Sequence, residues 1–284
     1  MWRITFTTNT RLAPACAEAL EAFCPTVSWI DSDEDGLVEV EGICEEEPDQ
    51  TTVMQSLTAV AGSELPPVTI EPLPDTDWLT LSYQSFPPKS LGRFWIYGCH
   101  ITEAPPEGAW PLQIDAATAF GSGEHPTTAG CLHAIETLEK THQFKNILDM
   151  GTGSGILAIA ATRAWTGQIT AIDIDPESIR VTRTHAEANG VESRIALQAG
   201  DGFAAPLSVQ NAPYDLLLAN ILAGPLCEMA PAGAAQVQSG GFIVLAGLLA
   251  TQAPMVIDAW AAQGCTVTTS ETIGEWTILT LQKS

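Results

Sequence analysis

The chain has 284 residues, 45% of them hydrophobic, and a formal net charge of −23 at pH 7. This composition indicates a soluble globular protein of one large or two ordinary domains, and no apolar run approaches the ~20 residues that cross a bilayer. The acidic excess disfavours binding to nucleic acid and favours basic partners, although solubility alone also explains it. The N-terminus has no signal-peptide pattern, so we expect a cytoplasmic protein.

The seven cysteines are scattered along the chain, and no two have C-x-x-C spacing. We therefore expect neither a disulfide framework nor a zinc site, and no other metal centre. The cysteines are predicted to be buried, reduced thiols.

Residues 1–75 alternate between strand and helix patterns. Strands are predicted at 4–7, 27–30, 37–40 and 68–70, and helices at 14–23 and 51–61. The resulting order, β-α-β-β-α-β, is typical of a small ferredoxin-like α+β domain. Residues 1–80 carry 16 acidic and 2 basic side chains without a catalytic pattern, so we interpret this domain as one for substrate recognition.

Residues 76–113 are rich in proline and aromatic side chains. We expect a structured linker, because prolines stiffen a connector and aromatic side chains pack on a neighbour. Core packing and contact with substrate both remain open as roles for these aromatic residues, which are Trp78, Tyr83, Phe86, Phe94, Trp95, Tyr97 and Trp110.

The third region, residues 114–284, begins with a loop that leads from Phe120 to Thr128 and into a predicted helix at 129–138. Glycines in the loop make it bendable, and Pro126 suits the first turn of the helix. His125 either fixes the loop through hydrogen bonds or takes part in binding or catalysis.

A glycine-rich turn, Asp149 to Gly155, follows the apolar strand 146–148 and precedes a helix at 156–165. Its G-x-G-x-G spacing differs from the G-x-G-x-x-G of dinucleotide enzymes, and Asp149 is suited to hold the ammonium of an amino-acid-like cofactor such as S-adenosylmethionine. Gly151 and Gly153 would let that cofactor lie against bare backbone. A structural turn without this ligand is the alternative.

From this turn onward strands and helices alternate. Strands are predicted at 169–173, 195–198, 215–219, 242–246, 265–269 and 276–281, and helices at 176–189, 222–235 and 252–262. The last two strands are separated by too few residues for a crossover helix, so they should be antiparallel. The fold class is therefore α/β, a doubly wound sheet that is mostly parallel and ends in an antiparallel hairpin. Such a hairpin is typical of the Rossmann-like sheet of class I methyltransferases and unusual in dehydrogenases.

Three strand ends place further polar side chains beside the turn, because ligands of such sheets lie beyond the carboxyl ends of the strands. Asp173 is placed to accept the hydrogen bonds of both ribose hydroxyls, and Asp201 that of an adenine amino group. Asn220 comes at the reacting end, where its carbonyl oxygen would orient an amine without taking a proton. Capping of the next helix is the alternative role for Asn220.

The motifs F-G-S-G-E-H-P-T-T at 120–128, D-M-G-T-G-S-G at 149–155, D-I-D-P at 173–176 and A-N-I-L-A-G-P-L at 219–226 occur in this order. With G-E-W at 274–276 they resemble the bacterial methyltransferases of ribosomal protein L11 of the large subunit, the PrmA family. The resemblance covers the chain from about Trp78 to the end. Ser122 and Glu124 depart from the threonines frequent in that family.

The resemblance implies S-adenosylmethionine as cofactor, with Thr128, Gly151, Asp173 and Asn220 in contact with it. Phe120 is also expected to be a cofactor-binding residue. It also implies methylation of lysine side chains and of the N-terminal amine of ribosomal protein L11, which the N-terminal domain would hold. Three alternatives remain open: a lysine methyltransferase of another small protein, an NAD-dependent oxidoreductase, and a non-catalytic protein-binding module. The sequence does not indicate the oligomeric state.

Overall fold

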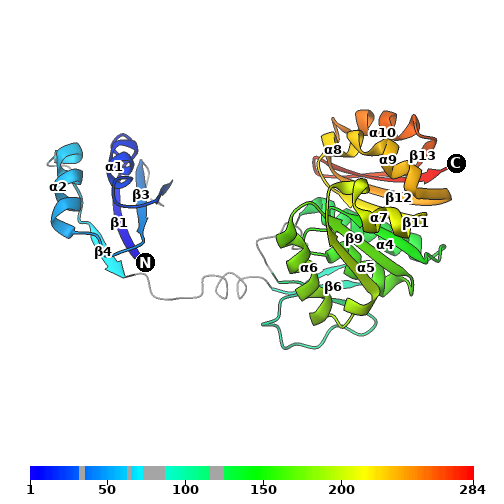
Figure 1. Ribbon diagram of the computed structural model, residues 1–284. Helices are drawn as coiled ribbons and strands as arrows, with labels where there is room; N and C mark the ends of the chain where they lie inside the picture. The colour runs from blue at the N-terminus through cyan, green and yellow to red at the C-terminus, as the bar shows by residue number, and fades with distance from the viewer. Residues whose placement is uncertain (32–35, 63–64, 73–86, 116–124) are drawn as a thin grey trace. The chain divides into compact units, whose positions relative to one another are not determined.

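The computed structural model describes residues 1–31, 36–62, 65–72, 87–115 and 125–284. The chain forms two compact units, residues 1–78 and 79–284, and in each of them helices pack on a sheet (Figure 1). Phe120 and the linker aromatics Trp78, Tyr83 and Phe86 lie outside the described ranges.

The first unit has the predicted order of elements, and its ferredoxin-like fold is confirmed. Its sheet is antiparallel with strand order β2-β3-β1-β4. The Asp49 side chain accepts a hydrogen bond of 3.1 Å from the Thr52 N–H and so begins the second helix. The elements are β1 (Trp2–Asn9), α1 (Ala13–Leu20), β2 (Thr26–Asp31), β3 (Leu37–Cys44), α2 (Gln50–Ala61) and β4 (Thr69–Pro72).

The two faces of this sheet differ in polarity. Ile4 and Phe6 of β1 are buried with the helices in one apolar core. Thr5 and Thr7 alternate with them and therefore lie on the other face, where Glu41 and Glu39 of β3 stand opposite. This second face carries hydroxyl groups and carboxylates, together with Arg3, which lies 3.8 Å from Glu41.

The prediction for the cysteines was wrong in part. Cys24, which follows α1, and Cys44, at the end of β3, form a disulfide with their Cα atoms 4.3 Å apart. The fold brings these two cysteines together, which their spacing of 20 residues in the sequence does not indicate. Cys99 is exposed and Cys227 half-buried, whereas the free cysteines Cys16, Cys131 and Cys265 are buried as expected.

The second unit begins with a three-stranded sheet in the region where we expected a linker. It consists of β5 (Lys89–Leu91), β6 (Phe94–Tyr97) and β7 (Trp110–Gln113), with β6 and β7 parallel. Phe94 and Leu112 are fully buried and share a core with Ile135 of α4 (Pro126–Glu139). Aromatic residues of this region therefore serve core packing, the first of the two roles considered.

The main sheet has seven strands in the order β10-β9-β8-β11-β12-β14-β13. The first five are parallel, and β14 runs antiparallel to both β12 and β13, which confirms the predicted fold class. The strands are β8 (Asn146–Met150), β9 (Gln168–Asp173), β10 (Ile195–Ala199), β11 (Tyr214–Asn220), β12 (Val237–Leu249), β13 (Cys265–Ile273) and β14 (Trp276–Lys283).

Helices bury both faces of this sheet. Leu216 and Leu218 of β11 join one apolar cluster, and Leu217 and Ala219 join another on the opposite face. The helices are α4, α5 (Ile156–Ala164), α6 (Pro176–Ala188), α7 (Pro206–Asn211), α8 (Ala223–Glu228), α9 (Ala230–Gln236) and α10 (Ala253–Ala261). Of the helices that the structure describes, each is too short or too polar to span a membrane.

Two local predictions in the second unit were wrong. The single helix expected at 222–235 is divided into α8 and α9, because Pro231 cannot donate the backbone hydrogen bond of a helix interior and instead occupies the first turn of α9. The short helix α7, which also begins with a proline, Pro206, was not predicted.

Candidate functional site

A cavity of about 780 Å³ lies at the carboxyl ends of β8, β9 and β11. The two central strands, β8 and β11, are neighbours, and the chain order reverses between them, which is where open parallel sheets bind ligands. The residues that line the cavity include Thr128, Met150, Gly151, Thr152, Gly153, Ile156, Asp173, Ile174, Asp201, Gly202, Phe203, Asn220, Ile221, Leu222, Glu228 and Met229.

The glycine-rich turn has a backbone that only glycine adopts easily. Gly151, Gly153 and Gly155 have φ angles of 73°, 55° and 83°. A Cβ on Gly151 would also lie 2.3 Å from Cγ2 of Ile221, and one on Gly155 would lie 2.6 Å from Cγ2 of Thr182. The turn is therefore enclosed by its neighbours on one side, and Gly151 and Gly153 line the cavity on the other.

Asp173, at the end of β9, joins the turn to the second strand. Its Oδ2 accepts a 2.9 Å hydrogen bond from the Gly153 N–H, and its Oδ1 accepts one of 3.0 Å from the Asp175 N–H. Each carboxylate oxygen retains a second lone pair, so the side chain can still accept hydrogen bonds from a ligand. Asp173 lines the cavity, as does Asp201 in the turn after β10.

Asp149 has a different position from the one expected, because it does not line the cavity. It is 1% exposed, and its Oδ2 accepts hydrogen bonds from the Thr152 hydroxyl (2.7 Å) and the Ala158 N–H (3.1 Å). Burial raises the pKa of Asp149 to about 7. The side chain thus holds the turn and the start of α5 together from behind.

Asn220 carries an unused acceptor. Its Oδ1 is buried and has no hydrogen-bond partner within the described part of the chain. Its Nδ2 is 3.5 Å from Oγ1 of Thr128, a fully buried residue in the first turn of α4. A buried carbonyl oxygen without a partner costs free energy, so a donor supplied by a ligand fits this position.

Ile221 fixes the position of Asn220, which the sequence did not indicate. Its N–H donates to Ala246 O (3.1 Å), and its side chain approaches Gly151. A Cβ on Gly247 would lie 2.2 Å from Ile221 O, at the register shift between Leu245 and Leu248 of β12. Glycine is required there because the two backbones touch.

His125 caps α4. Its Nδ1 lies 2.8 Å from the Thr127 hydroxyl and 3.4 Å from the Thr127 nitrogen, and its ring packs edge-on against Trp276 with the centroids 4.5 Å apart. The cavity lining does not include His125. The ring orients the helix that presents Thr128.

Several apolar residues of the cavity were not predicted. Ile174 and Leu222 are 74% and 70% exposed, although both are large and hydrophobic. Ile174 directly follows Asp173, and Leu222 comes two positions after Asn220. This closeness to a predicted polar residue is the only sequence pattern that identifies them. In the ranges described, no cluster of His, Cys, Asp and Glu is arranged to hold a metal ion.

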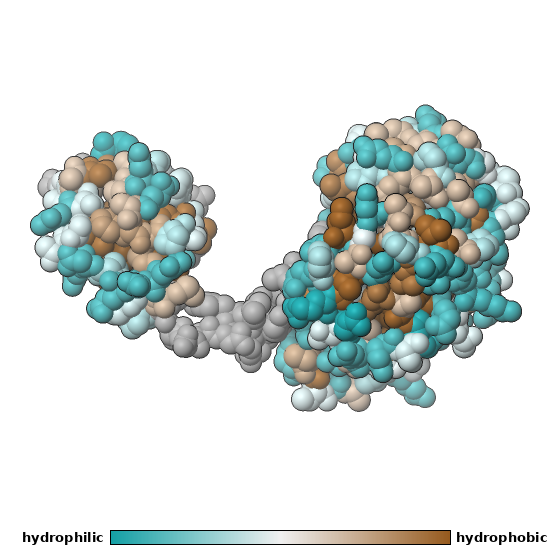
Figure 2. Space-filling view, in the orientation of Figure 1, coloured by the Kyte–Doolittle hydropathy of each residue, from teal (hydrophilic) through white to brown (hydrophobic). Residues whose placement is uncertain are grey.

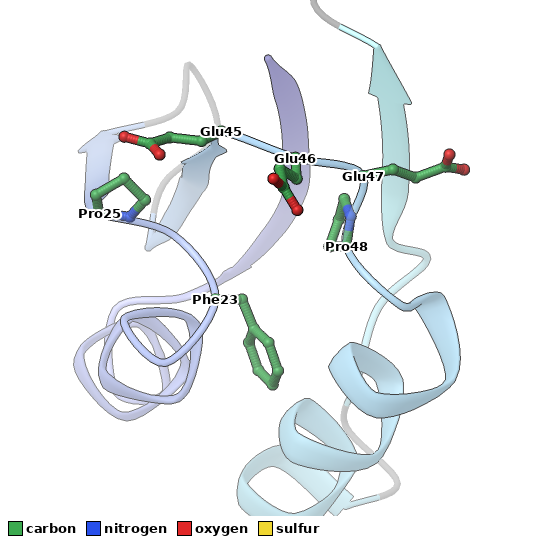
Figure 3. A pocket seen from close by; sticks show the side chains of 6 residues that line it. All are labelled: Phe23, Pro25, Glu45, Glu46, Glu47 and Pro48. Carbon is green, nitrogen blue, oxygen red and sulfur yellow. The ribbon is translucent and has the colours of Figure 1, made fainter.

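The first unit has a smaller cavity, of about 420 Å³, which we call the acidic groove; it is lined by Phe23, Pro25, Glu45, Glu46, Glu47 and Pro48. Figure 3 shows the three glutamates in a row on the segment between β3 and α2, with Phe23 below them. The carboxylates of Glu45 and Glu47 point in opposite directions. Figure 2 shows hydrophilic side chains around an apolar area on the visible face of this unit.

A model of the ribosomal protein L11 methyltransferase (PrmA) family matches residues 6–284. The chain belongs to this family. It is 40% identical over 220 residues to the ribosomal protein L11 methyltransferase of Brucella suis. The aligned region covers 78% of this chain and 76% of that protein. It is 39% identical over 214 residues to that of Rhizobium rhizogenes, with coverage of 75% and 73%.

A solved structure of a ribosomal protein L11 methylase from Lactobacillus delbrueckii subsp. bulgaricus is similar to the chain with a TM-score of 0.63 and 28% identity. The match covers 70% of this chain and all of that one. The family assignment makes the chain an S-adenosylmethionine-dependent methyltransferase, and the cavity beside the glycine-rich turn is its candidate active site.

Proposed function

We propose that the chain transfers methyl groups from S-adenosylmethionine to amino groups of ribosomal protein L11, on lysine side chains and at the N-terminus. The observation that carries this proposal is the buried Oδ1 of Asn220 in the cavity beside the glycine-rich turn, which has no hydrogen-bond partner among the residues that the structure describes. An amine is a donor that satisfies this acceptor. The names of the relatives support ribosomal protein L11 as the substrate.

The residues of the cavity fit S-adenosylmethionine. Gly151 and Gly153 offer backbone that a ligand can touch, and a Cβ on Gly151 would take the space of Ile221. Asp173 would accept the ribose hydroxyls and Asp201 the adenine amino group, with Thr128 at the methyl end. When bound, the cofactor supplies an electrophilic methyl group on a sulfonium.

Asn220 would orient the attacking amine. Its Oδ1 accepts a hydrogen bond from the amine N–H, which leaves the nitrogen lone pair directed at the methyl group. As positive charge develops on the nitrogen, this hydrogen bond strengthens, and alignment of the two reactants contributes roughly 7–11 kcal/mol. An amide takes no proton, so the amine must arrive neutral.

Loss of that proton to solvent before docking is costlier for lysine than for an α-amine. With pKa values of about 10.4 and 7.8, the neutral forms at pH 7 cost roughly 4.6 and 1 kcal/mol. We therefore expect turnover on lysine to increase with pH across the neutral range. His125 is poorly placed as a base, since its Nδ1 is engaged with Thr127 and the ring lies against Trp276.

The first unit is proposed as the part that holds the protein substrate. The acidic groove and Glu39 on the second face of the sheet are complementary in charge to a basic protein. In this proposal residues 1–75 bind the substrate and residues 114–284 carry out the transfer, and the region 76–113 between them contributes Phe94 and Leu112 to the core of the second unit. The reaction would take place in the cytoplasm, where ribosomal proteins are made.

The test is transfer of a labelled methyl group to purified ribosomal protein L11, followed by identification of the modified amines. Labelled lysines and a labelled N-terminus are expected. Label in another small protein of a cell extract, with none in ribosomal protein L11, would assign a different substrate. Calorimetric binding of NAD without binding of S-adenosylmethionine would overturn the proposed cofactor.

A further inference from the structure

His185 of α6 joins the glycine-rich turn to the strand β7. It is 3% exposed, and both ring nitrogens have partners. Nδ1 lies 2.7 Å from the backbone carbonyl oxygen of Ser154, and Nε2 lies 3.2 Å from the backbone nitrogen of Asp115, just beyond β7. One side chain thus connects three elements that are distant in sequence.

The two partners determine which nitrogen carries the proton. A backbone N–H only donates, so Nε2 must accept from Asp115. A carbonyl oxygen only accepts, so Nδ1 must carry the hydrogen and donate to Ser154. His185 is therefore a neutral imidazole in the Nδ1–H tautomer, and a methylated or doubly protonated ring would not satisfy both contacts.

Neighbouring side chains of α6 make the same kind of contact. The Thr182 hydroxyl, one helical turn earlier, donates to Gly153 O (2.9 Å), so two successive carbonyls of the glycine-rich turn are held by one face of α6. At the end of the helix the Asn189 side chain donates to Gln113 O (2.8 Å) and accepts from Gln113 N (3.0 Å). Side chains of α6 thereby take the place of a neighbouring strand along the end of β7.

We propose that His185 is a positioning residue for the cofactor: its bond to Ser154 fixes the peptide orientation of the glycine-rich turn against which S-adenosylmethionine lies. This inference rests on the proposed function of the cavity. His185 does not line the cavity, so it acts through Ser154 and not by touching the cofactor. The bond to Asp115 secures the correct tautomer, in which Nδ1 is the donor.

The test compares the binding of S-adenosylhomocysteine by calorimetry in the full chain and three His185 variants. His185→Leu removes both bonds and should raise Kd roughly tenfold, the effect of about one hydrogen bond. In His185→Asn the amide nitrogen takes the place of Nδ1 and retains the bond to Ser154, so Kd should stay within about threefold of wild type. In His185→Gln the amide reaches only the position of Nε2, so Kd should be close to that of the leucine variant.

Thr184→Ala is the matched control, because Thr184 is exposed on the same helix. In the leucine variant the KM for S-adenosylmethionine should increase with Kd, whereas turnover at saturating cofactor should change less than about twofold, so that the effect of losing His185 appears in KM and not in kcat. Long-range proton–nitrogen NMR spectra should show the Nδ1–H tautomer. Thermal melting shows whether a variant has a folding defect. Positioning is supported when the loss of affinity for S-adenosylhomocysteine is large in the leucine and glutamine variants and small in the asparagine variant.

Two results would overturn the inference. The first is a wild-type Kd in His185→Leu, and the second is rescue by glutamine but not by asparagine, which would assign the role to Asp115. Failure of the wild-type chain itself to bind S-adenosylhomocysteine would instead contradict the proposed function of the cavity.

Discussion

Replacement of Asn220 by alanine should reduce turnover far more than cofactor affinity. The substitution removes Oδ1, a buried acceptor that has no partner in the described ranges of the chain and that would hold the amine. It also removes Nδ2, but the contact of that group with Thr128 Oγ1 is long, 3.5 Å, and contributes little. Turnover should therefore decrease strongly while the affinity for the cofactor changes little.

The magnitude follows from the charge that develops on the nitrogen. A hydrogen bond to a charged group contributes about 1.5–3 kcal/mol, so kcat on ribosomal protein L11 should decrease roughly 10–150-fold. The Kd of S-adenosylhomocysteine should increase by less than about threefold, because the contact that is lost beside the cofactor is the weak one between Nδ2 and Thr128 Oγ1.

Single-turnover methyl transfer with saturating cofactor measures the first quantity, and calorimetry the second. Asn220→Asp is a useful comparison, since a carboxylate retains an acceptor but stabilises the protonated amine, so its rate should recover as pH increases. Equal losses of turnover and cofactor affinity in Asn220→Ala would refute the reasoning and leave Asn220 as a binding residue only.

Three further predictions concern the turn and the acidic groove. Gly151→Ala should lower the free energy of unfolding by about 1–2 kcal/mol and weaken cofactor binding in calorimetry, because φ is 73° and the added Cβ meets Ile221 at 2.3 Å. Gly224→Ala is the control and should have neither effect, because a Cβ on this residue of α8 would meet no atom of the described residues within 4 Å. Burial raises the pKa of Asp149 from 3.8 to about 7, so this side chain favours the folded state most below pH 4, and that contribution is lost as pH increases to 7, by about 4 kcal/mol at most. Asp149→Asn should abolish this pH dependence in urea unfolding between pH 4 and 7, and an unchanged slope would contradict it. Replacement of the three glutamates at 45–47 by glutamine should raise KM for ribosomal protein L11 several-fold at low salt and leave kcat unchanged, whereas an unchanged KM would exclude the acidic groove as a docking surface.

Much of the fold was predictable because it depends on periodicity and on local rules. Alternating apolar residues gave the strands of both units, and the short connection before Trp276 required an antiparallel hairpin. Proline and aspartate fixed the starts of helices such as α6, where Asp175 caps the Glu177 N–H at 2.9 Å. The strands β5 to β7 were missed because each is only three or four residues long, and the sheet that they form gains its stability from packing on α4 and α5.

The candidate site likewise has residues that the sequence identified and one whose position it did not. Glycine spacing and polar residues at strand ends identified Gly151, Asp173, Asp201 and Asn220, all of which line one cavity, because in a parallel sheet the carboxyl ends of strands meet at one edge. Asp149 belongs to the same motif, yet it points from β8 into the core, and its position could not be read from spacing.

The sequence by itself determined the succession of most strands and helices along the chain, the glycine-rich turn and the identity of the polar groups near it, because each depends on residues that are close together along the chain. Only the tertiary structure decided what those groups contact. It joined Cys24 to Cys44, buried Oδ1 of Asn220 where no described residue is its partner, and placed His185 between Ser154 and Asp115. Such contacts depend on the packing of distant segments, and packing depends on the shape of every neighbour at once.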